Sequence, residues 1–146
     1  MMADLHINDF YKDCGLIFIA LYQYFPKPIT LYIEDISGPD NVDQYGLHSD
    51  RHLRCLGAFL WLQEEGYIRF EQQVKQLAFD HCRLSHKALS LLTQSRYQGA
   101  SGTAQPLPVS VAVERSNRIN QMRVAIDSQD STAIADIARN LLFDSK

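Results

Sequence analysis

Histidine and cysteine side chains are the residues of this sequence best suited to metal chemistry, and they form two short pairs. His52 and Cys55 are three residues apart and would share a helix face, and Cys82 and His86 are four apart. All four are ligand types for zinc. The sequence lacks the C-x-x-C pair that marks many zinc sites. We therefore expect no metal site and no cofactor. We interpret the cysteines as small buried residues, and His48 and His52 as solvated or capping groups.

A redox-sensing thiol is a second chemical possibility. Cys55 is close in sequence to Arg51, His52 and Arg54, but such a role requires an exposed thiol with a low pKa.

The stretch "GASG" at 99–102 lacks the lysine and flanking strand of a phosphate-binding loop. We find no nucleophile motif and no paired carboxylates, so we do not expect an enzyme.

The composition is typical of one folded domain with a short appendage. The chain has 146 residues, of which 46% are hydrophobic and 21% charged, which excludes a disordered chain. No apolar run approaches the roughly 18 residues of a membrane span, and the N-terminal residues do not resemble a secretory signal. Three scattered cysteines do not form a disulfide framework. We expect a cytoplasmic protein without membrane contact.

Three helices are predicted in the first half of the chain. Apolar residues recur at helical spacing over 8–24, and the prolines of "FPKPIT" end that helix. Thr30 is a suitable N-cap for a short helix over 31–36. Ser49 or Asp50 can cap a third helix that ends at Gly66, since glycine readily adopts the left-handed conformation of a helix C-terminus.

A β-hairpin and a fourth helix are predicted next. "YIRFEQ" alternates apolar and polar residues, as a strand does, and "LAFDHCRLS" is its expected partner. The alternation breaks in the second strand, because Phe79 indicates one face and Cys82 and Leu84 the other. A β-bulge would place them on the same face. Ser85 then caps a helix over 86–95.

The last third of the chain is predicted to be a linker followed by two short helices. Residues 97–109 are rich in small residues and proline, and apolar stripes predict helices over 114–126 and 131–143. We divide the chain into a domain at 1–96, a linker at 97–109 and a helical appendage at 110–146. Short helices need a packing surface, so we expect the appendage to form a homodimer; folding back onto its own domain is the alternative.

Two short motifs resemble the winged-helix (winged helix-turn-helix) domain. Leu62, Gly66 and Tyr67 stand where bacterial regulators of the multiple-antibiotic-resistance and phenolic-acid-repressor types end a recognition helix and open a wing strand. Ser85 and Lys87 stand in the motif "leucine-threonine-x-lysine-glycine" that starts their next helix, with serine replacing threonine and alanine replacing glycine. The resemblance covers residues 8–96. It implies a mainly α fold with a small β-hairpin and a role in transcriptional regulation.

The resemblance also indicates which residues would contact double-stranded DNA. The third helix of a winged helix enters the major groove with its first residues at the base edges, which here are Ser49, Arg51 and Arg54. Arginine is well suited to bidentate contact with guanine. Arg69 and Lys75 in the hairpin would contact phosphates.

The charge distribution keeps a second function open. Residues 1–96 contain nine Lys or Arg and twelve Asp or Glu, and residues 34–50 contain five acidic residues and no basic one. Phosphate contacts supply most non-specific affinity for DNA, so an acidic approach to the third helix opposes binding. The alternative is a winged helix that binds another protein, with Trp61 and Tyr67 as contact residues.

Overall fold

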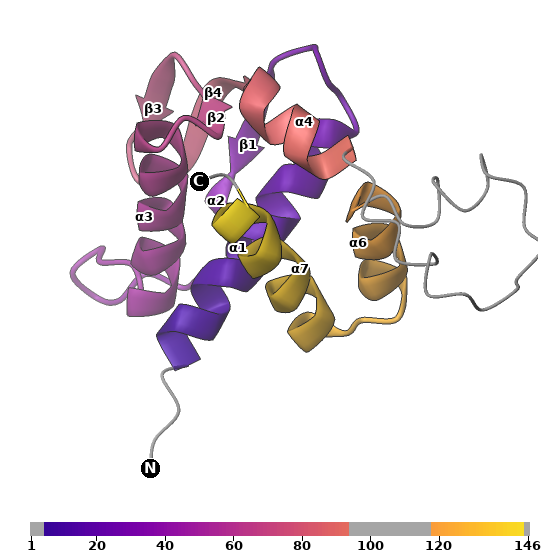
Figure 1. The fold of residues 1–146 in the computed structure, drawn as a ribbon. Coiled ribbons are helices and arrows are strands. Elements are labelled where there is room, and N and C mark those ends of the chain that lie inside the picture. Colours follow the sequence, from indigo (N-terminus) through magenta and orange to yellow (C-terminus); the bar gives the residue numbers. More distant parts are fainter. Residues whose placement is uncertain (1–4, 94–117, 145–146) are drawn as a thin grey trace, which may run out of the picture.

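The computed structural model describes residues 5–93 and 118–144 and shows a mixed α/β structure (Figure 1). The described part contains six helices and a four-stranded antiparallel sheet. In chain order the elements are α1 (Leu5–Tyr22), β1 (Ile29–Tyr32), α2 (Ile33–Ser37), α3 (Asp50–Glu64), β2 (Ile68–Arg69), β3 (Gln72–Val74), β4 (Ala78–Leu84), α4 (His86–Thr93), α6 (Arg118–Asp127) and α7 (Ser131–Asp144).

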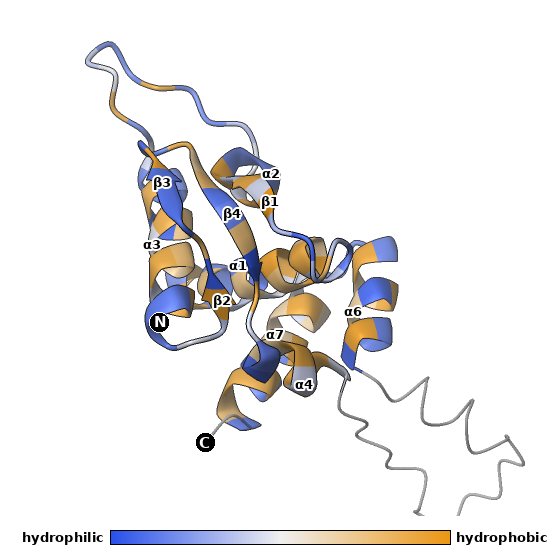
Figure 2. Ribbon diagram, turned by 90° about the horizontal axis from the view of Figure 1, so that it is seen from above, coloured by the Kyte–Doolittle hydropathy of each residue, from blue (hydrophilic) through white to orange (hydrophobic). Residues whose placement is uncertain are grey.

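Helix α1 lies at the centre of the molecule, as its broad apolar face predicts. Cys14, Ile17 and Phe18 are fully buried, and the helix packs against α3, α7 and the sheet. In Figure 2 the middle of α1 and the neighbouring α7 are predominantly hydrophobic. Buried residues of α1 belong to the same hydrophobic cluster as those of the strands and the other helices, so the core is continuous around α1.

The sheet is larger than the predicted hairpin, because β1 was not expected. Thr30 does not cap a helix. Its Oγ1 donates to Asp80 Oδ1 at 2.6 Å across the sheet, and helix α2 begins at Ile33 without a side-chain cap. Strand β1 pairs with β4, which satisfies the backbone groups of residues that follow two prolines. The strand order is β1-β4-β2, and β3 also pairs with β4.

The predicted bulge is confirmed in β4. Ile29 is paired with Cys82 and Leu31 with Phe79, so β4 has one residue more than β1 between these pairs. His81 takes up the extra residue with a φ of 53°. Phe79 and Cys82 therefore both reach the core, where both are fully buried. The bulge leaves His81 exposed on the outer face of the sheet.

The two motif regions meet at the end of α3. Gly66 has a φ of 83°, the left-handed conformation expected after a helix. Ser85 Oγ donates to the Gly66 carbonyl oxygen at 2.6 Å and accepts from the Ala88 N–H at 3.2 Å, which also caps α4. Lys87 Nζ donates to the carbonyl oxygen of Glu65 at 2.9 Å. The second motif therefore satisfies the carbonyl groups at the C-terminus of α3.

Helices α6 and α7 pack onto α1 of the same chain, which is the alternative arrangement expected for the appendage. Met122 of α6 and Leu141 of α7 are fully buried in the common core. Helices α1 and α7 approach so closely at Gly15 that a Cβ atom there would lie 2.7 Å from Ile134 Cγ2. The apolar stripes are thus covered within one chain, which removes the reason to place a dimer interface on them. The predicted linker at 97–109 lies outside the described residues.

Two glycines, one inside α3 and one just after it, test the end of this helix. A Cβ at either Gly57 or Gly66 would meet nothing within 4 Å, but only Gly66 has a positive φ. We expect Gly66→Ala to lower the free energy of unfolding by about 1 kcal/mol through backbone strain. Gly57→Ala, inside α3, should raise it by about 0.5–1 kcal/mol. Chemical denaturation measures both, and equal effects of the two substitutions would contradict this account of the helix end.

Candidate interaction surface on α3

Ser49 and Arg51, two of the predicted DNA-contacting residues, have internal roles at the start of α3. The Ser49 side chain accepts from the His52 N–H at 3.2 Å and caps the helix. Arg51 faces α1 and forms a bidentate pair with Asp13, with distances of 2.8 Å from Nη1 to Oδ2 and 2.6 Å from Nη2 to Oδ1. Arg51 Nε also lies 3.7 Å from Asp9 Oδ2. The guanidinium group is therefore engaged within the chain.

Asp13 is a buried carboxyl group on α1, with 1% of its side chain exposed. Burial raises its pKa, and the hydrogen bonds from Arg51 oppose that rise. The pKa of Arg51 is raised in turn by its hydrogen bond to Asp13. A buried carboxylate needs a partner of this kind, so Arg51 stabilises the contact between α1 and α3.

The outward side of α3 is mainly apolar and carries no basic residue at its centre. At 100° per residue, the side opposite the buried Cys55, Phe59 and Leu62 consists of Asp50, Leu53, Gly57, Leu60, Trp61 and Glu64. All six are exposed except Leu60, which is partly buried. We call these six residues the α3 face. Arg54, the remaining predicted residue on this helix, is exposed and lies at the edge of this face toward α1.

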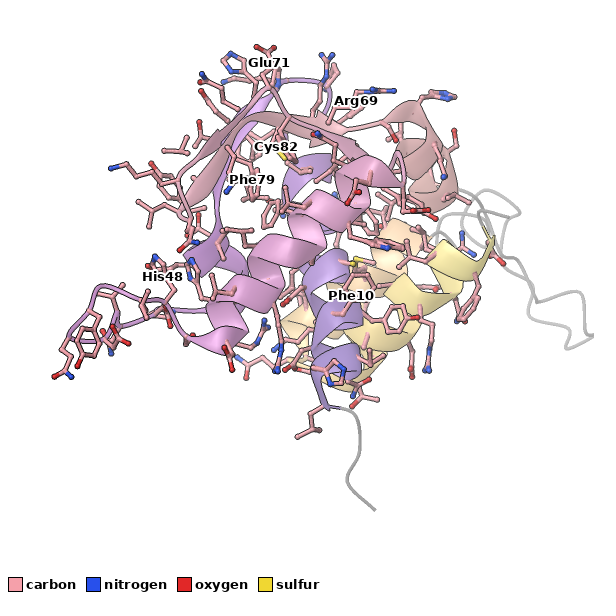
Figure 3. All side chains as sticks on the ribbon, turned by 90° about the vertical axis from the view of Figure 1, so that its left-hand side faces the viewer. Phe10, His48, Arg69, Glu71, Phe79 and Cys82 are labelled. Carbon is pink, nitrogen blue, oxygen red and sulfur yellow. The ribbon has the colours of Figure 1, made fainter. Side chains whose placement is uncertain are left out.

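A groove runs along the α3 face between α1 and α3. Its volume is about 520 Å³, and its lining includes Phe10, Arg54, Gly57 and Trp61. The Phe10 and Trp61 rings meet edge to face with centroids 5.1 Å apart. A second hollow of about 260 Å³ shares both rings and extends to Phe143 of α7. Figure 3 views this side of the molecule, with Phe10 on α1 beside α3. Aromatic side chains thus connect the two hollows.

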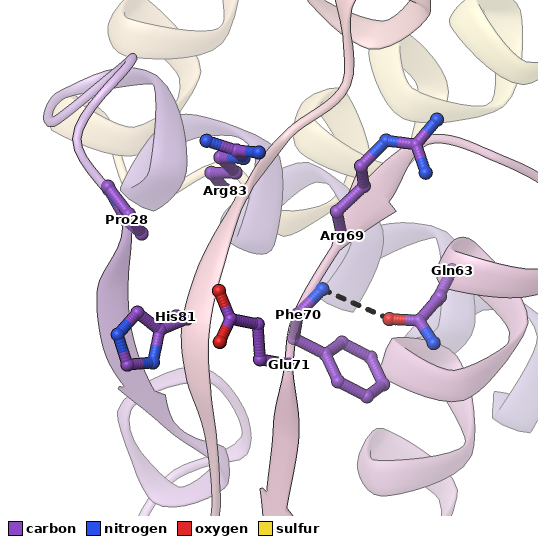
Figure 4. Close-up of a pocket in the computed structure, with 7 residues that line it drawn as sticks. All are labelled: Pro28, Gln63, Arg69, Phe70, Glu71, His81 and Arg83. Atoms are coloured by element: carbon purple, nitrogen blue, oxygen red, sulfur yellow. Dashed lines mark hydrogen bonds between the residues drawn. The ribbon is translucent and has the colours of Figure 1, made fainter.

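The predicted hairpin residues lie apart from the groove, on the sheet. Arg69 is exposed on β2 and is paired directly with Arg83 of β4, which is also exposed. Neither arginine forms an ion pair with another described residue. With His81 they border a hollow of about 320 Å³, shown in Figure 4. Like charges directly opposite each other destabilise a sheet, so this pair would favour an anion. Lys75 is exposed in the turn before β4.

The cysteines do not have the properties of a redox sensor. Cys14, Cys55 and Cys82 are free and fully buried. Burial raises the pKa of all three thiols, to about 12 for Cys82. A thiol of high pKa without solvent access is unreactive. Their place in the core agrees with the interpretation as small buried residues.

No protein-family model, curated protein or solved structure matches this chain. None of the described helices has the length and apolar composition needed to cross a bilayer. The winged-helix resemblance therefore depends on the residues and geometry of this chain alone.

The internal role of Arg51 predicts a strong effect on stability. Arg51→Met leaves the buried Asp13 carboxylate unpaired, which costs about 3–5 kcal/mol when a pair is fully buried. Since 31% of the Arg51 side chain is exposed, we expect about 2–3 kcal/mol at neutral pH. Arg54→Met is the matched control on the same helix and should change the free energy of unfolding by less than about 0.5 kcal/mol.

The pH dependence of Arg51→Met identifies the cause. Burial raises the pKa of Asp13 above its unfolded value, so the folded state holds the proton more tightly than the unfolded state. This tighter binding of the proton stabilises the folded state below about pH 4. The stabilisation is lost as the pH rises through the pKa of Asp13 in the folded state. Removing Arg51 raises that folded pKa further. Denaturation at several pH values should therefore show the smallest deficit in acid, and a deficit independent of pH would contradict the role of Asp13.

Proposed function

We propose that this chain is a winged-helix interaction module that binds a helix of another protein on the α3 face. Three features support the winged-helix assignment. The elements follow the order helix, strand, short helix, helix and then strands β2 to β4; Gly66 ends the third helix; and the second motif contacts that end through Ser85 and Lys87. Fold alone does not establish function, so the functional proposal depends on the surface chemistry of α3.

The composition of the α3 face is the observation that carries the proposal. A helix that enters the major groove needs polar and basic side chains at base edges and phosphates. Here Leu53, Gly57 and Trp61 are exposed where those side chains would stand, and Arg51 is paired with Asp13. Tryptophan is among the residues that contribute most to protein interfaces. The surface is thus better matched to an apolar partner than to DNA.

The charges around the face specify the kind of helix that fits. Asp50 and Glu64 stand at the two ends of the face, and Glu65 lines the adjoining hollow. An amphipathic helix with apolar residues at positions i, i+3 or i+4 and i+7 fills such a groove. Lysine or arginine residues at both ends of that helix would complement the two carboxylates.

Site-specific photocrosslinking tests the location of the partner. A photoreactive amino acid at Leu53, which is 37% exposed, should capture a protein that the same group at Val124, which is 68% exposed on α6, does not. The captured protein is then purified and its affinity measured. Trp61→Ala should weaken binding by at least about 2 kcal/mol, roughly thirtyfold, while Val124→Ala leaves it unchanged.

Three results would overturn this proposal. Equal capture from both positions would mean that the crosslinks are non-specific. Unchanged affinity of the Trp61→Ala variant, with wild-type circular dichroism, would remove the α3 face from the interface. A product containing only two copies of this chain would place the expected homodimer on this face instead.

DNA binding is the second candidate, and the unpaired arginines of the sheet favour it. Arg69 and Arg83 lie side by side and exposed, as residues that contact a phosphate backbone do. If duplex DNA is the ligand, the double variant Arg69→Ala/Arg83→Ala should reduce the slope of log affinity against log salt by about 2.

Fluorescence anisotropy with a random-sequence duplex across a salt series measures this slope. Arg139→Ala on α7 is the matched control, because Arg139 is paired with Asp136 and lies on another helix. It should leave the slope unchanged. Absence of wild-type binding at the lowest salt concentration, or the same slope in the double variant, excludes the sheet as a DNA-contacting surface.

A further inference from the structure

Three metal-ligating side chains converge where the loop after α2 meets the start of α3. Asp40 and His48 belong to the loop, and His52 belongs to the first turn of α3. One potential ligand atom from each residue lies within 4.8 Å of those of the other two. His48 Nδ1 is 2.9 Å and His52 Nδ1 is 3.7 Å from the same oxygen, Asp40 Oδ2. Figure 3 shows His48 beside the N-terminal end of α3.

His52 has a buried nitrogen without a hydrogen-bond partner. Its side chain is fully buried, and Nδ1 forms no hydrogen bond. The other ring nitrogen, Nε2, lies 2.6 Å from the carbonyl oxygen of Gln76. A carbonyl oxygen only accepts, so Nε2 carries the proton and donates it. In the neutral imidazole, Nδ1 then presents a lone pair toward Asp40, the arrangement of a metal-ligating histidine whose second nitrogen is held by a backbone carbonyl.

Asp40 and His48 are also partly withdrawn from solvent. The exposed fractions of their side chains are 9% and 11%. Asp40 Oδ2 also accepts a hydrogen bond from the Ser49 N–H at 3.1 Å, which holds this oxygen beside the start of α3.

We propose that Asp40, His48 and His52 form a binding site for a divalent transition-metal ion, with Zn²⁺ as the ion best matched to two imidazoles and one carboxylate. Zinc sites with three protein ligands complete a tetrahedron with water. This proposal is independent of what the α3 face binds. No cysteine takes part, and for that reason the spacing rules based on cysteine pairs do not reveal the site.

Binding requires a small movement of the loop. The rings of His48 and His52 are stacked with centroids 4.0 Å apart and planes within 9° of parallel. A metal ion lies close to the plane of each imidazole that binds it, and two stacked rings share no plane. His52 is fixed by Gln76, so His48 must tilt toward Asp40. The ligand atoms then approach the separation of about 3.3 Å that zinc–nitrogen distances near 2.0 Å impose on a tetrahedron.

A bound ion would fasten the loop to α3. The site joins the loop to the turn of α3 that precedes Leu53, the first apolar residue of the α3 face. Metal binding would therefore stabilise the folded state as well as fix the loop, because the unfolded chain does not hold the three ligands together.

Calorimetric titration of the full-length, EDTA-treated protein with Zn²⁺ tests the site. We expect one equivalent to bind and to raise the melting temperature. His48→Ala should weaken binding by at least about tenfold, and Asp40→Asn should do so as well. The matched control is His81→Ala, because His81 stands 3.4 Å from Asp80 in a histidine–carboxylate pair that has no third ligand among residues 5–93 and 118–144. The affinity of the His81→Ala variant for Zn²⁺ should equal that of the wild type.

Substitution of Co²⁺ for Zn²⁺ identifies the ligands independently. Tetrahedral nitrogen and oxygen ligation gives visible absorption bands without the near-ultraviolet charge-transfer band of a thiolate. A thiolate band would assign the metal to a cysteine and overturn the proposal. So would a wild-type protein that binds no Zn²⁺, or equal affinities of the wild type and the His48→Ala variant when circular dichroism shows both to be folded.

Discussion

The buried carboxylate of Asp13 joins the central helix α1 to α3 through its bidentate pair with Arg51. Asp13 lies on the central helix with 1% of its side chain exposed, and its only described cationic partner within 4.0 Å is Arg51. With Arg51 held toward α1, and Cys55, Phe59 and Leu62 buried, the exposed residues of α3 include Leu53 and Trp61. The ion pair and the buried apolar residues of α3 therefore act together to set which side of the helix faces the solvent.

The bulge in β4 has a comparable effect on the sheet. Without the extra residue, Phe79 and Cys82 would face opposite sides of a regular strand. With it, both reach the core, and Arg83 points outward opposite Arg69. The α3 face and the arginine pair are thus two surfaces of different chemistry on neighbouring elements. The first is apolar between carboxylates, and the second is cationic.

Local chemistry made several features predictable from the sequence. The cap at Ser49, the helix end at Gly66 and the presence of a bulge in the second hairpin strand each depend on residues that are close together in the sequence. Strand β1 was missed because its pairing partner lies about fifty residues away in the sequence, and Thr30 resembles a helix cap when that partner is unknown. The packing of α6 and α7 onto α1 was predicted only as an alternative, because apolar stripes do not reveal which surface covers them.

The candidate sites depend on contacts that the sequence does not encode locally. Arg51 was expected to contact DNA, yet its partner Asp13 is thirty-eight residues away. The outward position of Arg83 follows from a bulge that could be foreseen but not placed. Asp40 and His48 lie in an irregular loop that brings them to His52. No regular spacing in the sequence therefore indicates that these three residues could bind one ion. The residue types in the sequence indicated which kinds of contact were chemically possible. The tertiary structure determines which of these side chains lie close enough to make them.

Trp61 provides the most direct test of the central claim, since it is the only tryptophan in the sequence and lies in the groove on the α3 face. Its fluorescence emission and its quenching by acrylamide can be measured while the full-length protein is titrated with the crosslinked and purified partner, and separately with duplex DNA. We predict a blue shift and reduced quenching with the partner, because Trp61 loses contact with water, and no shift with DNA. A partner that binds without affecting Trp61, or a blue shift produced by DNA, would contradict the assignment of the α3 face to protein binding.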